Sequence, residues 1–140
     1  MKIAILGSGG REHSIAYTIS KSKKIKKIYC LPGNAGTADV AENIIININN
    51  FEEVYKFLKR EEVDLVIIGP EQPLVDGIVD FLEECQIKVF GPNKIASQLE
   101  GSKIFTKTLC KKFNIPTADF GVFEKIEDAK NFLKNVNYPI

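Results

Sequence analysis

Short apolar runs alternate with segments of helical periodicity over the first 90 or so positions of the sequence. Each run is apolar throughout, and most end in glycine or proline, which predicts buried strands. The predicted strands cover residues 2–6, 27–31, 44–46, 64–68 and 88–90. Between them, apolar side chains recur every three or four positions, which predicts amphipathic helices over about residues 11–20, 51–58 and 75–82. This alternation predicts an α/β fold with a doubly wound parallel sheet of Rossmann-like type.

The pattern changes after Gly91. Two consecutive helices are expected at Lys94–Glu100 and Lys103–Phe113, then a short strand at Ala118–Phe123 and a helix carrying the apolar positions Ile126, Ala129, Leu133 and Val136. Residues 138–140 resemble the start of another strand. We therefore expect a first domain over residues 1–100, and over residues 101–140 a linker helix with the truncated start of a second domain.

Composition excludes several classes of function. The formal net charge of +1 gives no general argument for nucleic acid, and the lysines between positions 21 and 27 are explained as a solvated run at the end of a helix. The three cysteines are too far apart for a zinc motif and are expected to be buried free thiols of a reducing compartment. The opening apolar run is too short for a signal peptide or a membrane span. We expect a cytoplasmic protein without nucleic-acid or membrane partners.

The strongest local motif is Gly7-Ser8-Gly9-Gly10-Arg11-Glu12-His13, set between a strand and a helix. Glycines allow a sharp turn, and amides at a helix N-terminus favour an anion, so we expect phosphate binding here, with a simple tight turn as the alternative. The dinucleotide fingerprint is incomplete, because Glu12 stands at its third glycine and the second strand ends without the expected acid. The only histidine, His13, is interpreted as a structural or loop-shaping group.

Other segments follow strands at the carboxyl edge of the predicted sheet, where ligands of such folds bind. The stretch Pro32–Thr37 is either ordinary turn chemistry or a ligand loop, and its role stays open. Glu71 either complements a helix dipole or accepts hydrogen bonds from sugar hydroxyls. At the junction of the two predicted domains, Lys103 is either a surface lysine or a ligand of anionic phosphates.

These motifs, together with Phe90-Gly91-Pro92, Leu99–Lys103 and Ile115–Ala118, occur in the order and spacing of phosphoribosylamine–glycine ligases, and the chain resembles the front of that family. The resemblance implies a pre-ATP-grasp domain over residues 1–100 and an ATP-grasp fold that begins near Lys103. It further implies that Gly9, Gly10, Arg11 and Glu12 cradle the ribose-phosphate substrate, that Glu71 binds its ribose, and that Lys103 reaches the phosphates of ATP.

The family's reaction, so implied, is a carbon–nitrogen ligation in de novo purine biosynthesis. ATP and glycine form a glycyl phosphate, which the amine of 5-phosphoribosylamine attacks to give glycinamide ribonucleotide, ADP and phosphate. The resemblance places the catalytic residues and the ligands of Mg²⁺ (or Mn²⁺) beyond Ile140, so the 140 residues alone are predicted to be inactive. Two rivals remain: an NAD-dependent oxidoreductase, disfavoured by the incomplete fingerprint, and a non-catalytic ribonucleotide-sensing module.

Overall fold

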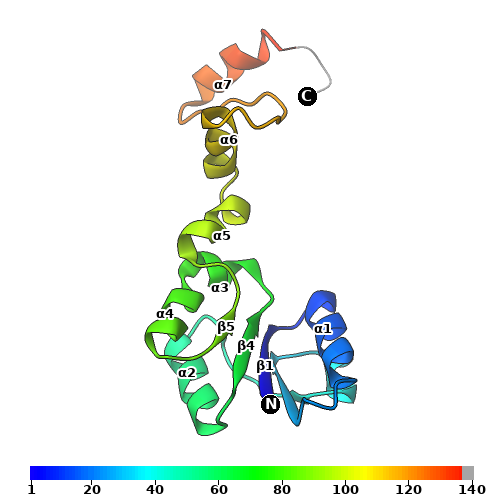
Figure 1. Cartoon of the computed structure of the whole chain (residues 1–140). Coiled ribbons are helices and arrows are strands. Elements are labelled where there is room, and N and C mark those ends of the chain that lie inside the picture. Colours follow the sequence, from blue (N-terminus) through cyan, green and yellow to red (C-terminus); the bar gives the residue numbers. More distant parts are fainter. Residues whose placement is uncertain (137–140) are drawn as a thin grey trace. The chain divides into compact units, whose positions relative to one another are not determined.

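The computed structural model describes residues 1–136 and divides the chain into two compact units, Met1–Gly101 and a second that begins at Ser102 (Figure 1). The strand start expected at residues 138–140 lies outside the described residues.

The first unit contains a five-stranded sheet in the order β3-β2-β1-β4-β5, in which every pairing is parallel. Its strands are β1 (Lys2–Gly7), β2 (Lys27–Pro32), β3 (Glu42–Asn43), β4 (Leu65–Ile68) and β5 (Val89–Phe90). The predicted parallel α/β fold is thereby confirmed. Since β1 lies in the middle of the sheet, both of its faces are covered, which explains why residues 3–6 are all apolar and buried.

Helices cover both faces of this sheet. They are α1 (Gly10–Ser20), α2 (Phe51–Arg60), α3 (Glu71–Asp76), α4 (Ile78–Glu84) and α5 (Lys94–Gly101), with a short 3-10 turn, η1 (Thr37–Asp39). Figure 1 shows α1 on one side of the sheet and α2 and α4 on the other. The core is divided accordingly: Leu6 packs with Leu58 and Leu82 on the α2 and α4 side, and Ile5 packs with Ala16 on the α1 side.

The sheet order creates a switch point between β1 and β4. From β1 the chain winds outward to β2 and β3, and it then crosses back to place β4 on the other side of β1. Connections leave the carboxyl ends of β1 and β4 toward opposite faces, and the crevice between such connections is where open α/β sheets bind ligands. The loops that follow β1 and β4 are therefore the expected place for a ligand.

The third strand lies two residues earlier than the sequence predicted. It covers Glu42–Asn43, so the expected strand at residues 44–46 is wrong. The amide of Ile44 still donates to the carbonyl of Cys30 at 2.9 Å, but the chain then leaves the sheet. Ile44 and Ile46 pack against the core while Ile45 is exposed, so the apolar side chains cover the edge of the core without extending the ladder.

The helix expected around residues 75–82 is two helices. Gly77, at φ 102°, ends α3 and precedes α4, and its amide donates to the carbonyls of Pro73 and Leu74. A left-handed glycine at this position is a common helix stop. The apolar periodicity continues across the break, which is why the pattern alone did not reveal it.

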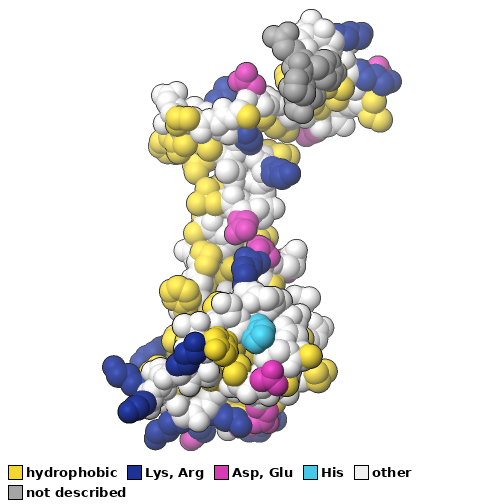
Figure 2. Space-filling model, turned by 90° about the vertical axis from the view of Figure 1, so that its right-hand side faces the viewer, with side chains coloured by type: hydrophobic (Ala, Val, Ile, Leu, Met, Phe, Trp, Pro, Cys, Tyr) yellow, Lys and Arg dark blue, Asp and Glu magenta, His cyan; other side chains and the backbone are white. Residues whose placement is uncertain are grey.

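The second unit contains α6 (Lys103–Lys112) and α7 (Ile126–Leu133). The strand predicted at Ala118–Phe123 does not form, and α7 ends before Val136. A strand needs a neighbour for its backbone hydrogen bonds, and no strand of the described residues pairs with this segment. None of residues 102–136 is buried, and Figure 2 shows hydrophobic side chains exposed on this unit. Every helix within residues 1–136 is too short or too polar to cross a bilayer.

Candidate functional site

The loops that follow β1, β2 and β4 are joined by hydrogen bonds at the carboxyl edge of the sheet. Gly33 donates to the carbonyl of Gly7 at 3.1 Å, and Gly69 donates to the carbonyl of Leu6 at 3.1 Å. The side-chain amide of Asn34 donates to the carbonyl of Ser8 at 2.8 Å. These bonds bring three segments that are distant in the sequence together around the switch point.

The loop after β1 leads directly into the N-terminus of α1. Gly9 is the N-cap and has no side chain to bind the first amides of the helix. Gly10 is exposed, and a Cβ added there would meet no atom within 4 Å. A helix N-terminus with amides accessible from open space favours an anionic ligand, because the helix dipole and the N–H groups both attract negative charge.

Glu12 is buried beneath this loop, with only 4% of its surface exposed. One carboxylate oxygen accepts a hydrogen bond from the amide of Gly9 at 2.6 Å. A Cβ added to Gly7 would lie 2.7 Å from the Glu12 Cγ, and a Cβ on Gly69 would overlap the carboxylate. The glycines after β1 and β4 therefore make room for this side chain. Its second oxygen, Oε1, is buried without a hydrogen-bond partner among the described residues.

This arrangement differs from a dinucleotide-binding loop. In that fingerprint the third glycine allows the helix to pack closely on the strand. Here the corresponding position is Glu12, and the space comes from Gly7 and Gly69 on the strand side. The Glu12 side chain thus fills the space that Gly7 and Gly69 leave open, which explains why a glutamate can stand where the fingerprint has its third glycine.

Arg11 and Glu71 meet across the switch point. Arg11 lies in the first turn of α1 and Glu71 opens α3, and the guanidinium donates to the Glu71 carboxylate at 2.5 Å. This hydrogen bond lowers the pKa of the Glu71 carboxyl and raises the pKa of Arg11, so both groups are charged at neutral pH. Both side chains remain accessible, at 66% and 43% exposed, so a ligand can reach them.

The loop after β2 contains a hydrogen-bond network that the sequence did not reveal. Thr37 is fully buried, and its amide donates to the Asn34 side-chain oxygen at 3.0 Å. The Thr37 hydroxyl accepts from the Asn34 amide at 2.7 Å, and Asn43 donates to the Asn34 carbonyl at 2.6 Å. A Cβ at Gly36 would overlap the ring of His13, so these two residues are in close contact. The only sequence signal for Asn34 was its place between glycines.

The structure thus brings together five of the six predicted site residues: Gly9, Gly10, Arg11, Glu12 and Glu71. Lys103 is exposed and begins α6 in the separate second unit. No group of three or more metal-binding side chains occurs among residues 1–136. Burial raises the pKa of the Cys30 thiol to about 11, so this cysteine is protonated and unreactive at neutral pH.

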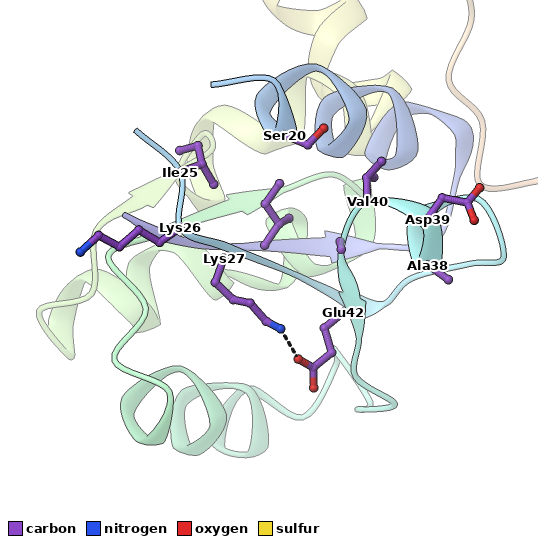
Figure 3. Close-up of a pocket in the computed structure, with 10 residues that line it drawn as sticks. Ser20, Ile25, Lys26, Lys27, Ala38, Asp39, Val40 and Glu42 are labelled. Atoms are coloured by element: carbon purple, nitrogen blue, oxygen red, sulfur yellow. Dashed lines mark ion pairs between the residues drawn. The ribbon is translucent and has the colours of Figure 1, made fainter. Parts of the chain in front are cut away.

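A separate hollow of about 510 Å³ lies at the outer edge of the sheet, lined by residues of β2, η1 and β3 (Figure 3). An ion pair of 2.6 Å between Lys27 and Glu42 crosses it. Lys27 is at the amino end of β2, whereas ligands of this fold bind at the carboxyl ends of the strands. The candidate functional site is therefore the one at the switch point.

Comparison with known proteins identifies the family of the chain. Residues 1–100 match the family model described as "Phosphoribosylglycinamide synthetase, N domain". The phosphoribosylamine–glycine ligase of Clostridium acetobutylicum is 46% identical over the whole chain, which spans 34% of that relative's length. The chain thus spans about a third of the length of the curated relatives that it matches.

Solved structures give the same result. The phosphoribosylamine–glycine ligase of Thermotoga maritima superposes with a TM-score of 0.75 at 34% identity, over 99% of this chain and 32% of that one. N5-carboxyaminoimidazole ribonucleotide synthetase from Thermus thermophilus superposes with a TM-score of 0.69 at 24% identity, over 98% of this chain and 37% of that one, which shows a shared fold. The chain belongs to the phosphoribosylglycinamide synthetase N-domain family.

Proposed function

We propose that the chain is the ribose-phosphate-binding domain of an ATP-dependent ligase of de novo purine biosynthesis. The enzyme joins glycine to 5-phosphoribosylamine and produces glycinamide ribonucleotide, ADP and phosphate. The observation that carries this proposal is the convergence of the β1 loop, Arg11 and Glu71 at the switch point, in a chain 46% identical to a phosphoribosylamine–glycine ligase.

In this proposal the substrate's 5-phosphate binds at the N-terminus of α1. Gly9 and Gly10 form part of the loop that surrounds it, and the guanidinium of Arg11 supplies a positive charge at the same place. Glu12 contributes from beneath, because its buried carboxylate holds the Gly9 amide and with it the shape of the loop. The loop fits a phosphate monoester better than a dinucleotide, since the dinucleotide fingerprint is interrupted at Glu12.

Glu71 binds the ribose in this arrangement. Only one of its oxygens bonds to Arg11, and an ionised carboxylate can accept hydrogen bonds from two adjacent hydroxyls. Binding the sugar and the phosphate together fixes the amine of the substrate in place. Such positioning lowers the barrier for attack on the glycyl phosphate formed from glycine and ATP.

The remaining parts of the reaction are assigned to the second unit and to parts beyond this chain. We propose that the second unit begins an ATP-grasp domain in which Lys103 contacts the phosphates of ATP. Mg²⁺ or Mn²⁺, which screens the charge of the transferring phosphoryl group, would be bound by parts beyond this chain, because the described residues contain no fitting cluster of ligands. The free cysteines fit a cytoplasmic, reducing location.

The activity is tested by comparing the 140-residue chain with the complete ligase that contains it. The complete protein is expected to form glycinamide ribonucleotide from ATP, glycine and 5-phosphoribosylamine generated from ribose 5-phosphate and ammonia. The 140-residue chain is expected to form none, since the residues assigned to catalysis lie outside it. Product is measured by mass spectrometry. Turnover by the 140-residue chain would contradict the assignment of catalysis to residues outside it. Absence of turnover in the complete protein would favour a non-catalytic sensing module.

A further inference from the structure

One peptide unit of the glycine-rich loop after β1, which we call the phosphate loop (Gly7–Gly10), is held from both ends. The carbonyl of Ser8 accepts a hydrogen bond from the Asn34 side chain at 2.8 Å. The amide of Gly9, which belongs to the same peptide unit, donates to Glu12 at 2.6 Å. Because a peptide unit is planar and its C=O and N–H groups point in opposite directions, these two contacts fix its orientation.

The following peptide unit is fixed on one side only. The Gly9 carbonyl accepts from the Asn34 side chain at 3.3 Å and from the amide of His13 at 3.1 Å. The amide of Gly10 belongs to this second unit and must point away from that carbonyl. Gly10 is exposed and a Cβ added there would meet no atom within 4 Å, so a ligand has room beside this peptide unit.

Asn34 is itself held in one orientation. Its side-chain oxygen accepts from the amide of Thr37 at 3.0 Å, so its NH₂ group is the end that faces the loop. The main chain of Asn34 is also held, because its amide donates to the Thr37 hydroxyl and its carbonyl accepts from Asn43. Since Thr37 is fully buried, this network ties the loop after β2 to the core.

We propose that Asn34 is a positioning residue for the phosphate loop. It orients the carbonyls of Ser8 and Gly9, so that the amide of Gly9 stays on Glu12 and the amide of Gly10 faces the phosphate group of the substrate. This inference rests on the proposed function and gives a role to the Pro32–Thr37 loop, which the sequence left undecided. Asn34 acts through the loop backbone, so its loss should weaken phosphate binding without abolishing it.

The test uses the 140-residue chain and ribose 5-phosphate as the probe, with binding measured by calorimetry. Asn34→Ala removes both donors and is expected to weaken binding about 3- to 10-fold, the loss typical of neutral hydrogen bonds. Asn34→Asp keeps an acceptor for the Thr37 amide but has no N–H to donate, and it should also weaken binding. If Asn34→Ala does not fold, Asn34→Asp alone tests whether the side-chain donors of Asn34 support ribose 5-phosphate binding.

Asn50→Ala is the matched control. Asn50 caps α2 through a bond from the Glu53 amide, so its loss removes a comparable local contact remote from the loop after β1. Its melting temperature should fall while ribose 5-phosphate binding stays unchanged. In the complete ligase, Asn34→Ala should raise the KM for 5-phosphoribosylamine and leave kcat at saturation nearly constant, which a general loss of stability would not do.

The outcomes separate the two proposals. If the unmodified chain binds ribose 5-phosphate and both Asn34 variants bind it equally well, the positioning role is refuted and the proposed function stands. If the unmodified folded chain does not bind ribose 5-phosphate, the proposed function itself fails. Weaker binding in both Asn34 variants, with unchanged binding in Asn50→Ala, supports the inference.

Discussion

Replacement of Glu71 by alanine is expected to weaken the use of 5-phosphoribosylamine by the complete ligase roughly 10- to 150-fold. Hydrogen bonds to charged groups contribute about 1.5–3 kcal/mol, and each 1.4 kcal/mol corresponds to a factor of ten. The carboxylate lies beside Arg11 at the switch point and stays ionised because that contact lowers its pKa. Glu71→Gln keeps an acceptor oxygen, so it should weaken the use of 5-phosphoribosylamine less than Glu71→Ala does. Steady-state kinetics with each substrate varied in turn would measure both effects.

Thermal melting separates this role from a purely structural one. The ion pair with Arg11 is exposed, and exposed ion pairs contribute little to stability, so neither Glu71 variant should melt much below the unmodified protein. Glu52→Ala is a matched control, because Glu52 is also an acid in the first turn of a helix, α2. A lowered melting temperature with an unchanged substrate requirement would show that Glu71 only complements the helix dipole.

Gly10→Ala is expected to weaken ribose 5-phosphate binding about 5- to 100-fold while leaving the fold intact. The added methyl group meets no atom of the described structure, and alanine is about 1 kcal/mol more favourable than glycine within a helix. It would instead occupy the open space in which we place the phosphate, and crowding of that kind typically costs about 1–3 kcal/mol. Calorimetry and a melting curve on the same sample would measure the two effects separately.

Two comparison variants make this result specific. In Gly9→Ala the new Cβ would lie 2.8 Å from the Glu12 carboxylate, so stability and binding should fall together. Ser14→Ala changes an exposed position one turn further along α1 and should leave binding unchanged. Unaltered ribose 5-phosphate binding in Gly10→Ala would indicate that the glycine-rich loop is a tight turn and not a ligand site.

The parallel sheet could be predicted from the sequence because its strands are apolar runs bounded by turn residues. Strands were predicted wrongly where the local pattern of apolar residues does not determine which strands pair. Ile44 and Ile46 are apolar because they pack against the edge of the core. From the sequence alone, a segment that packs on the core in this way looks the same as a buried strand. The segment Ala118–Phe123 has a strand-like pattern but no pairing strand among the described residues.

The positions of the candidate site residues could be predicted where they depend only on the residue's own loop. Gly10, Arg11 and Glu71 each follow a strand at the carboxyl edge, so the fold alone brings them close. The contacts of Asn34 with Ser8, and of Glu12 with Gly69, join loops distant in the sequence. Their partners depend on the three-dimensional arrangement of the loops, which no periodicity encodes.

Binding of ribose phosphate at the switch point is tested most directly by a calorimetric comparison of two ligands on the unmodified 140-residue chain. We expect saturable, one-to-one binding of ribose 5-phosphate that is strongly reduced in Gly10→Ala, and no detectable binding of NAD⁺ over the same concentration range. Tight binding of NAD⁺ without binding of ribose 5-phosphate would contradict the account and would identify the switch point as a dinucleotide site.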